Sequence, residues 1–303
     1  MISVSGKNWE EIFFKKRLVE KIKLDHNFSE ILSKILVFRN FSETEIYSIN
    51  NHVKFSNPFL HEKDFLKASD ILIKHIRQKN DILVIGDYDV DGCVSTSLLI
   101  NFLNKLKIKN SYYIPNRFID GYGASLKLIK KILKKKIPKL IIMVDCGSNS
   151  YQAVEYLDSI NIETIIIDHH NITIPKPKAN AFINPKKKMN FKYYNHYCSA
   201  FLTYLFIDIF KKKNDIKIDN SNELIFVAIA CIADVMPCRE NNRYLLIEIF
   251  KNFNVNKNLI LKTFYELDKK NKKFEFDDIS YLFAPIMNSA GRIDDANKVV
   301  ELL

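Results

Sequence analysis

Cysteine and glycine are both scarce in this 303-residue sequence, which contains five of the former and seven of the latter. The cysteines form no Cys-x-x-Cys pair, and the amino-terminal segment has acidic residues but no hydrophobic secretion signal. We therefore expect reduced thiols and a cytoplasmic location rather than the disulfide framework of an exported protein. No uninterrupted apolar run approaches the roughly 20 residues that cross a bilayer, which argues against a membrane-spanning protein.

Three common motifs of nucleotide-binding proteins and hydrolases are also absent. The sequence has no G-x-x-x-x-G-K-[ST] loop, no G-x-G-x-x-G and no G-x-S-x-G. These absences argue against P-loop nucleotidases, dinucleotide-binding domains and α/β-hydrolases. A glycine-poor chain is expected to keep glycine where the backbone needs positive φ or a close approach. Six of the seven glycines lie in four segments: Gly86 and Gly92, Gly121 and Gly123, Gly147, and Gly291.

The net charge of +11 favours a polyanionic partner only weakly. Arginine supplies only seven of the 46 basic residues. The chain is rich in lysine, asparagine and isoleucine, a composition typical of an A+T-rich coding sequence, which raises the lysine content of the whole chain. Lysine-rich runs such as 130–136 are more often solvated helix faces than binding sites.

Apolar periodicity predicts an α/β protein. Residues 1–78 are mostly helical in pattern, with helices over 27–40, where Ser29 is a candidate N-cap, and over 63–80. Short apolar segments typical of buried strands follow at 81–86, 111–115, 139–144, 162–167 and 179–185. Helical segments separate them at 93–106, 124–136 and 151–159, and helices dominate after 198.

This alternation predicts a parallel sheet with helices on both faces. We expect a helical amino-terminal segment (1–78), the α/β domain (79–240) and a helical carboxy-terminal extension (241–303). Within the extension, an amphipathic helix beginning near Asp294 ends the chain on apolar residues.

Acidic residues follow three of the predicted strands. Because ligands bind at the carboxyl ends of parallel strands, we expect these side chains to meet at one edge of the sheet. Crowded acids must protonate, spread apart or share a cation, and carboxylates with imidazole suit Mn²⁺ or Mg²⁺. The three groups are Asp87, Asp89 and Asp91; Asp145 with Cys146 and Gly147; and Asp168, His169 and His170.

A fourth acid, Asp234, closes a later apolar run. Two divalent ions about 4 Å apart are a recurrent device for hydrolysing phosphate esters, and Asp145 is the best candidate to bridge them. Two simpler interpretations remain open. A single Asp after a strand is often a helix N-cap, and adjacent histidines are often surface residues. A receiver-type domain also gathers acids at strand ends, although it gives no reason for the His pair.

The segments GDYDVDG (86–92), VDCGS (144–148), DHH (168–170) and IADVMP (232–237) resemble, in order and spacing, those of the DHH phosphoesterase superfamily. The segments PNRFIDGYG (115–123), ENNR (240–243) and NSAGRIDDA (288–296) are similar to those of RecJ-type exonucleases. The resemblance covers the chain from about residue 80 to residue 303 and implies the DHH phosphoesterase fold.

This resemblance implies metal-dependent phosphodiester hydrolysis, as a 5′→3′ exonuclease on single-stranded DNA in DNA repair and recombination. It implies two ions, Mn²⁺ or Mg²⁺, and single-stranded DNA as the partner. A single-strand-binding protein or a helicase is a candidate protein partner, and no membrane is involved.

The resemblance also assigns residues. His170 would contact the scissile phosphate and assist proton transfer, with Asp168 supporting the His pair, and Asp145 would bridge the ions. Asp87 would stand in for the histidine that relatives place at the position of Ile85. The metal ligands would be Asp87, Asp89, Asp91, Asp145, His169 and Asp234, and the nucleic-acid contacts Asn116, Arg117, Ser199, Asn288 and Arg292. Tyr122 would either stack on a base or be buried.

Two departures from the RecJ-type pattern affect these expectations. The loop 197–206 lacks the usual glycines, so Ser199 would fill a phosphate-contacting role. RecJ-type enzymes continue into a second catalytic-half domain with a Gly-Gly-His segment and then an OB-like domain, which this sequence does not contain. We therefore expect a truncated chain with impaired activity. The alternatives are a DHH phosphoesterase for oligonucleotides or small phosphate compounds, and a non-catalytic scaffold that binds single-stranded DNA.

Overall fold

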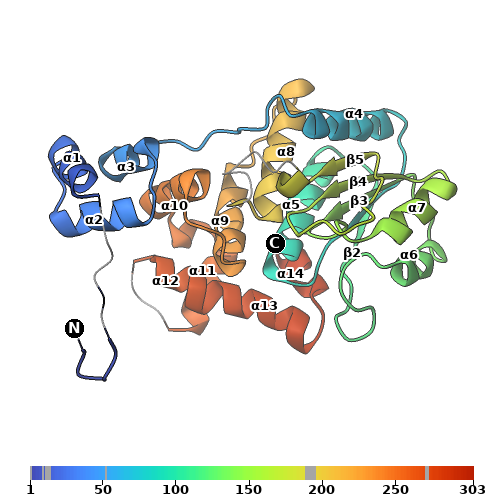
Figure 1. Cartoon of the computed structure of the whole chain (residues 1–303). Helices are drawn as coiled ribbons and strands as arrows, with labels where there is room; N and C mark the ends of the chain where they lie inside the picture. The colour runs from blue at the N-terminus through green and yellow to red at the C-terminus, as the bar shows by residue number, and fades with distance from the viewer. Residues whose placement is uncertain (1, 9, 11–14, 52, 188–195, 270–272) are drawn as a thin grey trace. The chain divides into compact units, whose positions relative to one another are not determined.

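Figure 1 shows the computed structural model of the chain, which describes residues 2–8, 10, 15–51, 53–187, 196–269 and 273–303. The chain divides into two compact units, residues 1–54 and residues 55–303. Each unit has its own hydrophobic core.

The described residues of the smaller unit form three helices: α1 (Lys16–His26), α2 (Glu30–Phe38) and α3 (Glu43–Asn50). Their apolar faces enclose a small core that includes Ile22 and Leu36. The predicted N-cap of α2 is confirmed, because the Ser29 hydroxyl accepts a hydrogen bond from the Leu32 N–H at 3.2 Å. Polar side chains therefore define where this helix starts, as its sequence predicts.

The larger unit is built on a five-stranded parallel sheet with the order β2-β1-β3-β4-β5. The three central strands are completely buried apart from the first residue of β4. The strands are β1 (Ile82–Ile85), β2 (Asn110–Tyr113), β3 (Leu140–Val144), β4 (Glu163–Ile167) and β5 (Ala181–Ile183).

Alternate strand residues face two separate cores. In β1, Ile82 and Val84 join the larger core, whereas Leu83 and Ile85 join the smaller one. Because both faces need apolar side chains, the central strands are continuous apolar runs rather than alternating ones. The expected fold class, a parallel sheet with helices on both faces, is confirmed.

Two layers of helices cover the sheet (Figure 1). The smaller core is closed by α6 (Leu126–Leu133) and α7 (Tyr151–Ser159), and the larger core by α4 (Lys63–Arg77), α5 (Val90–Lys105) and α8 (Ser199–Lys213). The predicted loop at 197–206 is wrong, because α8 starts at Ser199 and buries Phe201 and Phe206 in this core.

The remaining helices pack on α5 and on one another in the same unit. They are α9 (Leu224–Ala233), α10 (Glu240–Asn252), α11 (Leu259–Leu267), α12 (Phe276–Asp278), a π-helical turn (Ile279–Phe283), α13 (Ala284–Ile293) and α14 (Asn297–Leu302). The last helix begins at Asn297 rather than near Asp294, which is the C-cap of α13.

The structure divides the chain between residues 54 and 55, whereas the sequence predicts domain boundaries at 78/79 and 240/241. Helix α4 belongs to the larger unit because its apolar side packs against β5 and α8. Residues 241–303 share the core of the sheet, since Phe283 of the π-helical turn and Val299 of α14 are buried in it. Among the described residues, no helix is long and apolar enough to cross a membrane.

Candidate metal centre

The acidic groups predicted at the strand ends meet at the carboxyl edge of the sheet. The loops after β1, β3 and β4 carry Asp87, Asp145 and Asp168 respectively. Asp234 joins them from the end of α9, where it is the C-cap. The side chains of Asp87, Asp145 and Asp168 are almost completely buried, so these carboxyls face one another rather than bulk water.

The loop from Gly86 to Gly92 places three carboxylates in a short space. Asp89 is the N-cap of α5, because its Oδ1 accepts from the Gly92 N–H at 2.9 Å. A Cβ on Gly92 would lie 2.4 Å from the carbonyl oxygen of Asp87, so only glycine allows this tight turn. The N-cap interpretation therefore holds for Asp89, which still belongs to the acidic cluster.

Asp91 is held by the start of another helix. Its Oδ2 accepts from the Ser199 N–H at 2.7 Å and its Oδ1 from the Ala200 N–H at 2.8 Å. These donors are the first backbone N–H groups of α8, where the helix dipole favours a negative charge. The carboxylate is thereby fixed in one orientation facing His169.

Two groups of potential ligand atoms share this edge of the sheet. One consists of Asp91, His169 and Asp234, the other of Asp87, Asp89 and Asp145, and within each group the atoms lie within 4.8 Å of one another. His169 Nε2 is 3.7 Å from Asp91 Oδ2 and 3.4 Å from Asp234 Oδ2. The six residues predicted as metal ligands are thus brought together.

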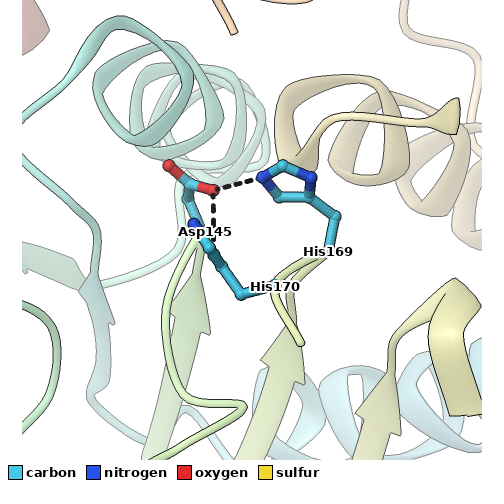
Figure 2. Close-up of side chains that lie close together, drawn as sticks. All are labelled: Asp145, His169 and His170. Carbon is cyan, nitrogen blue, oxygen red and sulfur yellow. Dashed lines mark ion pairs between the residues drawn. The ribbon is translucent and has the colours of Figure 1, made fainter. Parts of the chain in front are cut away.

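Asp145 links the two groups, because it belongs to the second and also forms a third set of potential ligands with His169 and His170. Its Oδ1 is 3.4 Å from His169 Nε2 and 3.9 Å from His170 Nδ1 (Figure 2). Its backbone has φ 57°, which is uncommon for a residue other than glycine and marks a strained, functional position. Asp145 caps no helix, and α7 begins only at Tyr151. The geometry therefore suits a carboxylate that bridges two ions.

Several buried atoms of the centre have no hydrogen-bond partner among the described residues. They include both carboxylate oxygens of Asp145 and one ring nitrogen of His169. The same holds for one oxygen each of Asp87 and Asp234. Because unpaired buried polar atoms are costly, these atoms fit divalent cations as their missing partners. Oxygen and imidazole donors are the set that Mn²⁺ and Mg²⁺ accept.

Burial and mutual repulsion raise the pKa values of these carboxyl groups. Burial, followed by the charge of Asp89, raises the pKa of Asp87 to about 7. Burial, followed by the charge of Asp91, raises the pKa of Asp234 to about 7. Burial and neighbouring carboxylates also raise the pKa of Asp145 well above its usual range. Without a cation, the centre therefore holds protons at pH values where isolated carboxyls are ionised.

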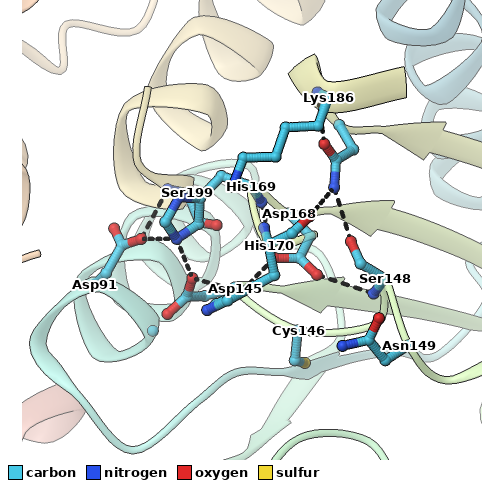
Figure 3. A network of polar contacts seen from close by, with 12 residues as sticks. Asp91, Asp145, Cys146, Ser148, Asn149, Asp168, His169, His170, Lys186 and Ser199 are labelled. Carbon is cyan, nitrogen blue, oxygen red and sulfur yellow. Dashed lines mark hydrogen bonds and ion pairs between the residues drawn. The ribbon is translucent and has the colours of Figure 1, made fainter. Parts of the chain in front are cut away.

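The two histidines have different environments (Figure 3). His170 Nδ1 lies 2.8 Å from Asp168 Oδ1, and this hydrogen bond raises the pKa of His170. Burial lowers the pKa of His169. Burial opposes ionisation of Asp168 too, but hydrogen bonds from His170 and Ser148 lower its pKa to about 2. His169 is thus suited to bind a cation as neutral imidazole, and His170 to donate a proton.

The hydroxyl of Tyr122 lies 3.0 Å from His170 Nε2. Its ring is also edge-on to the His170 ring, and the residue is 52% exposed. Tyr122 is therefore not buried, and it orients a histidine of the centre directly. The sequence shows only an aromatic residue between two glycines, so this contact could not be derived from it.

The two arginines expected to bind nucleic acid both lie near Tyr88. Arg117 lies over the Tyr88 ring at 5.6 Å, and both Arg117 and Arg292 act electrostatically on the Tyr88 hydroxyl. Both arginines are exposed. The segments 115–123 and 288–296, far apart in the sequence, therefore meet beside the loop that carries Asp87 and Asp89.

The other three residues expected to contact nucleic acid have structural contacts. Asn288 Oδ1 accepts from the Val90 N–H at 3.1 Å, which joins α13 to the start of α5. Asn116 Oδ1 accepts from the Phe118 N–H at 2.9 Å and shapes its own loop. Ser199 is fully buried, and it reaches the centre through its backbone N–H. A direct contact of the Ser199 hydroxyl with phosphate therefore has no support in this structure.

Comparison with known proteins agrees with this geometry. Residues 81–231, which contain the sheet and most of the centre, match the model of the DHH family, N-terminal domain. Over these residues the chain is therefore similar to the DHH family.

Beyond this domain, the chain is similar to RecJ proteins over most of its length. It is 30% identical, over 97% of its length, to the single-stranded-DNA-specific exonuclease RecJ of Escherichia coli (strain K12). It is 28% identical, over 95% of its length, to the protein of the same name from Bacillus subtilis (strain 168). The chain spans 53% of the first relative and 36% of the second.

Solved structures show the same fold. A crystal structure of exonuclease RecJ bound to manganese matches 80% of this chain and 60% of its own, with a TM-score of 0.70 and 26% identity. RecJ from Thermus thermophilus in complex with Mn²⁺ matches 95% of this chain and 41% of its own, with a TM-score of 0.76 and 21% identity. The expected resemblance to RecJ-type proteins is thus confirmed.

Proposed function

We propose that this chain hydrolyses the phosphodiester bonds of single-stranded DNA as a metal-dependent exonuclease. The observation that carries the proposal is the position of Asp145 at the carboxyl edge of the sheet: it belongs to one ligand group and lies 3.4 Å from His169 of the other. The relatives named single-stranded-DNA-specific exonucleases support the substrate. We further propose the 5′→3′ direction, a role in DNA repair and recombination, and a cytoplasmic location, as the sequence resemblance implies.

We propose that two ions, Mn²⁺ or Mg²⁺, bind the two ligand groups. Ions of this kind, when bound, supply activation of water and stabilisation of charge on the reacting phosphate. The chain contributes the arrangement around them. The residues that would hold the ions are Asp87, Asp89, Asp91, Asp145, His169 and Asp234.

His170 would act next to the scissile phosphate. Asp168 orients its imidazole at Nδ1 and Tyr122 contacts it at Nε2, so the ring is held from two sides. Because the bond to Asp168 raises the pKa of His170, its protonated form persists to higher pH than that of an isolated histidine. His170 can therefore donate a hydrogen bond to a phosphate oxygen, or a proton to the leaving group.

Arg117 and Arg292 would bind the DNA backbone. Both are exposed, and both lie beside Tyr88, next to the loop that carries the ligands. Arginine presents a planar fork of donors that matches phosphate oxygens. Tyr88 is half-buried, and its ring lies under the guanidinium of Arg117 at 5.6 Å.

A single set of assays tests the proposal against both alternatives. A 5′-labelled single strand, a duplex of the same sequence and a dinucleotide are incubated with Mn²⁺ or with EDTA. We expect labelled mononucleotide from the single strand from the first time point, little product from the duplex, and none with EDTA. Faster hydrolysis of the dinucleotide would instead indicate an oligonucleotide phosphoesterase. Binding of the strand without hydrolysis would indicate a scaffold.

A further inference from the structure

Lys186 lies at the edge of the candidate metal centre, in the 3-10 turn Pro185–Lys187 that follows β5. Its backbone N–H donates to Asn184 Oδ1 at 2.8 Å. The Asn184 amide in turn donates to Ser148 Oγ and to the His170 carbonyl oxygen, both at 2.8 Å. The start of the Lys186 side chain is therefore fixed relative to the loop that carries the His pair.

The side chains of Lys186 and its neighbour have different partners. The Lys187 ammonium pairs with Asp64 at 2.5 Å and donates to the Phe182 carbonyl oxygen at 2.9 Å. The Lys186 ammonium has no ion pair or hydrogen bond to any residue in the described part of the chain, although the residue is half-buried. Figure 3 shows its side chain extending from the end of β5 past His169. A cation in this position is free to bind an anion from outside the chain.

The charge of Lys186 reaches two of the potential metal ligands. Burial is the main cause that lowers the pKa of His169, and the charge of Lys186 acts in the same direction. For Asp234, burial and the charges of neighbouring carboxylates raise the pKa, and the charge of Lys186 opposes that rise. Figure 3 shows the Lys186 side chain extending past His169, so its charge lies near the ligand group that contains His169 and Asp234.

The position of Lys186 in the sheet differs from that of the two arginines. Arg117 follows β2, at one edge of the sheet, and Arg292 lies with it beside Tyr88, which follows β1. Lys186 follows β5, at the opposite edge. The ligand groups after β1, β3 and β4 lie between them, so cations stand on both sides of the acidic centre.

We propose that Lys186 binds a backbone phosphate of the single strand, on the opposite side of the metal centre from Arg117 and Arg292. The inference rests on the proposed function, since it takes single-stranded DNA as the ligand. The phosphate is not the scissile one, which belongs beside Asp145 and His170. Lys186 is thus a substrate-binding residue that holds a strand extending across the carboxyl edge of the sheet.

The test compares Lys186→Ala with Lys178→Ala, which removes the same charge from the exposed loop before β5. Affinity for a hydrolysis-resistant phosphorothioate single strand is measured with Mn²⁺ at several salt concentrations. We expect Lys186→Ala to raise the Kd about threefold to fivefold, as for one exposed ion pair. The slope of log K against log salt should fall by about 0.7, the value for one phosphate contact to a single strand. Lys178→Ala should change neither.

Kinetics on two substrates separate this role from a structural one. On a long natural strand, Lys186→Ala should raise KM and leave kcat within about twofold, because the contact binds substrate without reacting. On a dinucleotide with a single phosphodiester bond, the variant should equal the wild type. The melting temperature should be unchanged, since the Lys186 side chain makes no bond within the described chain.

A wild-type salt slope in Lys186→Ala, or an equal loss on the dinucleotide, would overturn the inference. The proposed function fails in a different way. If the wild type binds the strand but never hydrolyses it, the exonuclease proposal is wrong, and the salt slopes still decide whether Lys186 contacts phosphate. A wild type that does not bind the strand contradicts both.

Discussion

Asp145 Oδ1 and His169 Nε2 lie 3.4 Å apart, and neither atom has a hydrogen-bond partner in the part of the chain that the structure describes. Each atom belongs to a different strand-end loop, and each is buried. Two acceptor atoms that face each other in this way need a cation or a proton between them. The stability of the metal-free chain should therefore depend on protons, and that of the loaded chain on metal.

The first prediction concerns this dependence on pH. The pKa values of Asp87 and Asp234 are about 7 in the folded chain, above the usual 3.8, so the folded state binds more protons than the unfolded state between these values. Stability then falls as pH rises. We expect the free energy of unfolding of the metal-free chain to decrease between about pH 4 and pH 7 and to level off above, by up to about 1.4 kcal/mol per pH unit for each group. Urea unfolding in EDTA measures this.

Manganese supplies the control for the pH series. With Mn²⁺ bound, the carboxylates stay ionised, and stability should no longer fall over this range. The variant Asp87→Asn should make the metal-free profile less steep, because it removes one of the carboxyl groups with a raised pKa. If the free energy of unfolding of the metal-free wild type does not change with pH, the pKa values of these carboxyl groups are not raised by burial and mutual repulsion.

Gly291 is predicted to be indispensable for the packing of α13 on the loop that carries Asp87 and Asp89. A Cβ at this position would lie 2.3 Å from the Tyr88 carbonyl oxygen. Gly291→Ala should lower the free energy of unfolding by about 1 to 3 kcal/mol, as overpacking does, and weaken Mn²⁺ binding. Ser289→Ala is the matched control, because the Ser289 hydroxyl bonds only within α13, to the Ile286 carbonyl oxygen. Equal stability of the two variants would refute the close approach.

Tyr122→Phe separates the orientation of His170 from stacking on a base. The variant keeps the ring and removes the hydroxyl that lies 3.0 Å from His170 Nε2. If the hydroxyl orients the imidazole, kcat on single-stranded DNA should fall about tenfold with KM nearly unchanged. Steady-state kinetics measure the effect, with Tyr281→Phe, which alters an exposed tyrosine, as the control. An unchanged kcat would show that the Tyr122 hydroxyl does not orient His170, and that only the aromatic ring of Tyr122 could contribute.

The sheet could be predicted from the sequence because its central strands are short apolar runs, and each is followed by acids or by glycine. Val84 and Ile85 must both be buried, and only a sheet covered on both faces buries neighbouring strand residues. The sequence predicts helices after residue 198, but what holds the start of α8 could not be predicted from local pattern. Its first backbone N–H groups are satisfied by Asp91, a residue more than a hundred positions earlier in the chain.

The candidate centre was predictable in composition but not in its supporting contacts. Strand-end position alone brings Asp145, Asp168 and His169 to one edge. The contact of Asn184 with the His170 loop, and that of Arg117 with the Tyr88 ring, depend on how distant segments pack. Asn288 was expected to contact DNA, but its Oδ1 bonds the backbone at Val90. A polar residue in a motif can serve the fold of the site rather than the ligand.

Calorimetric titration of the metal-free chain with Mn²⁺ tests the central claim most directly. We predict two bound ions in the wild type. In Asp145→Asn, which keeps the shape of the side chain but removes its charge, we predict that affinity falls at both sites, by at least about tenfold, because the shared ligand is weakened. Two ions bound by Asp145→Asn with wild-type affinity, or a single ion bound by the wild type, would contradict a centre that is bridged by Asp145.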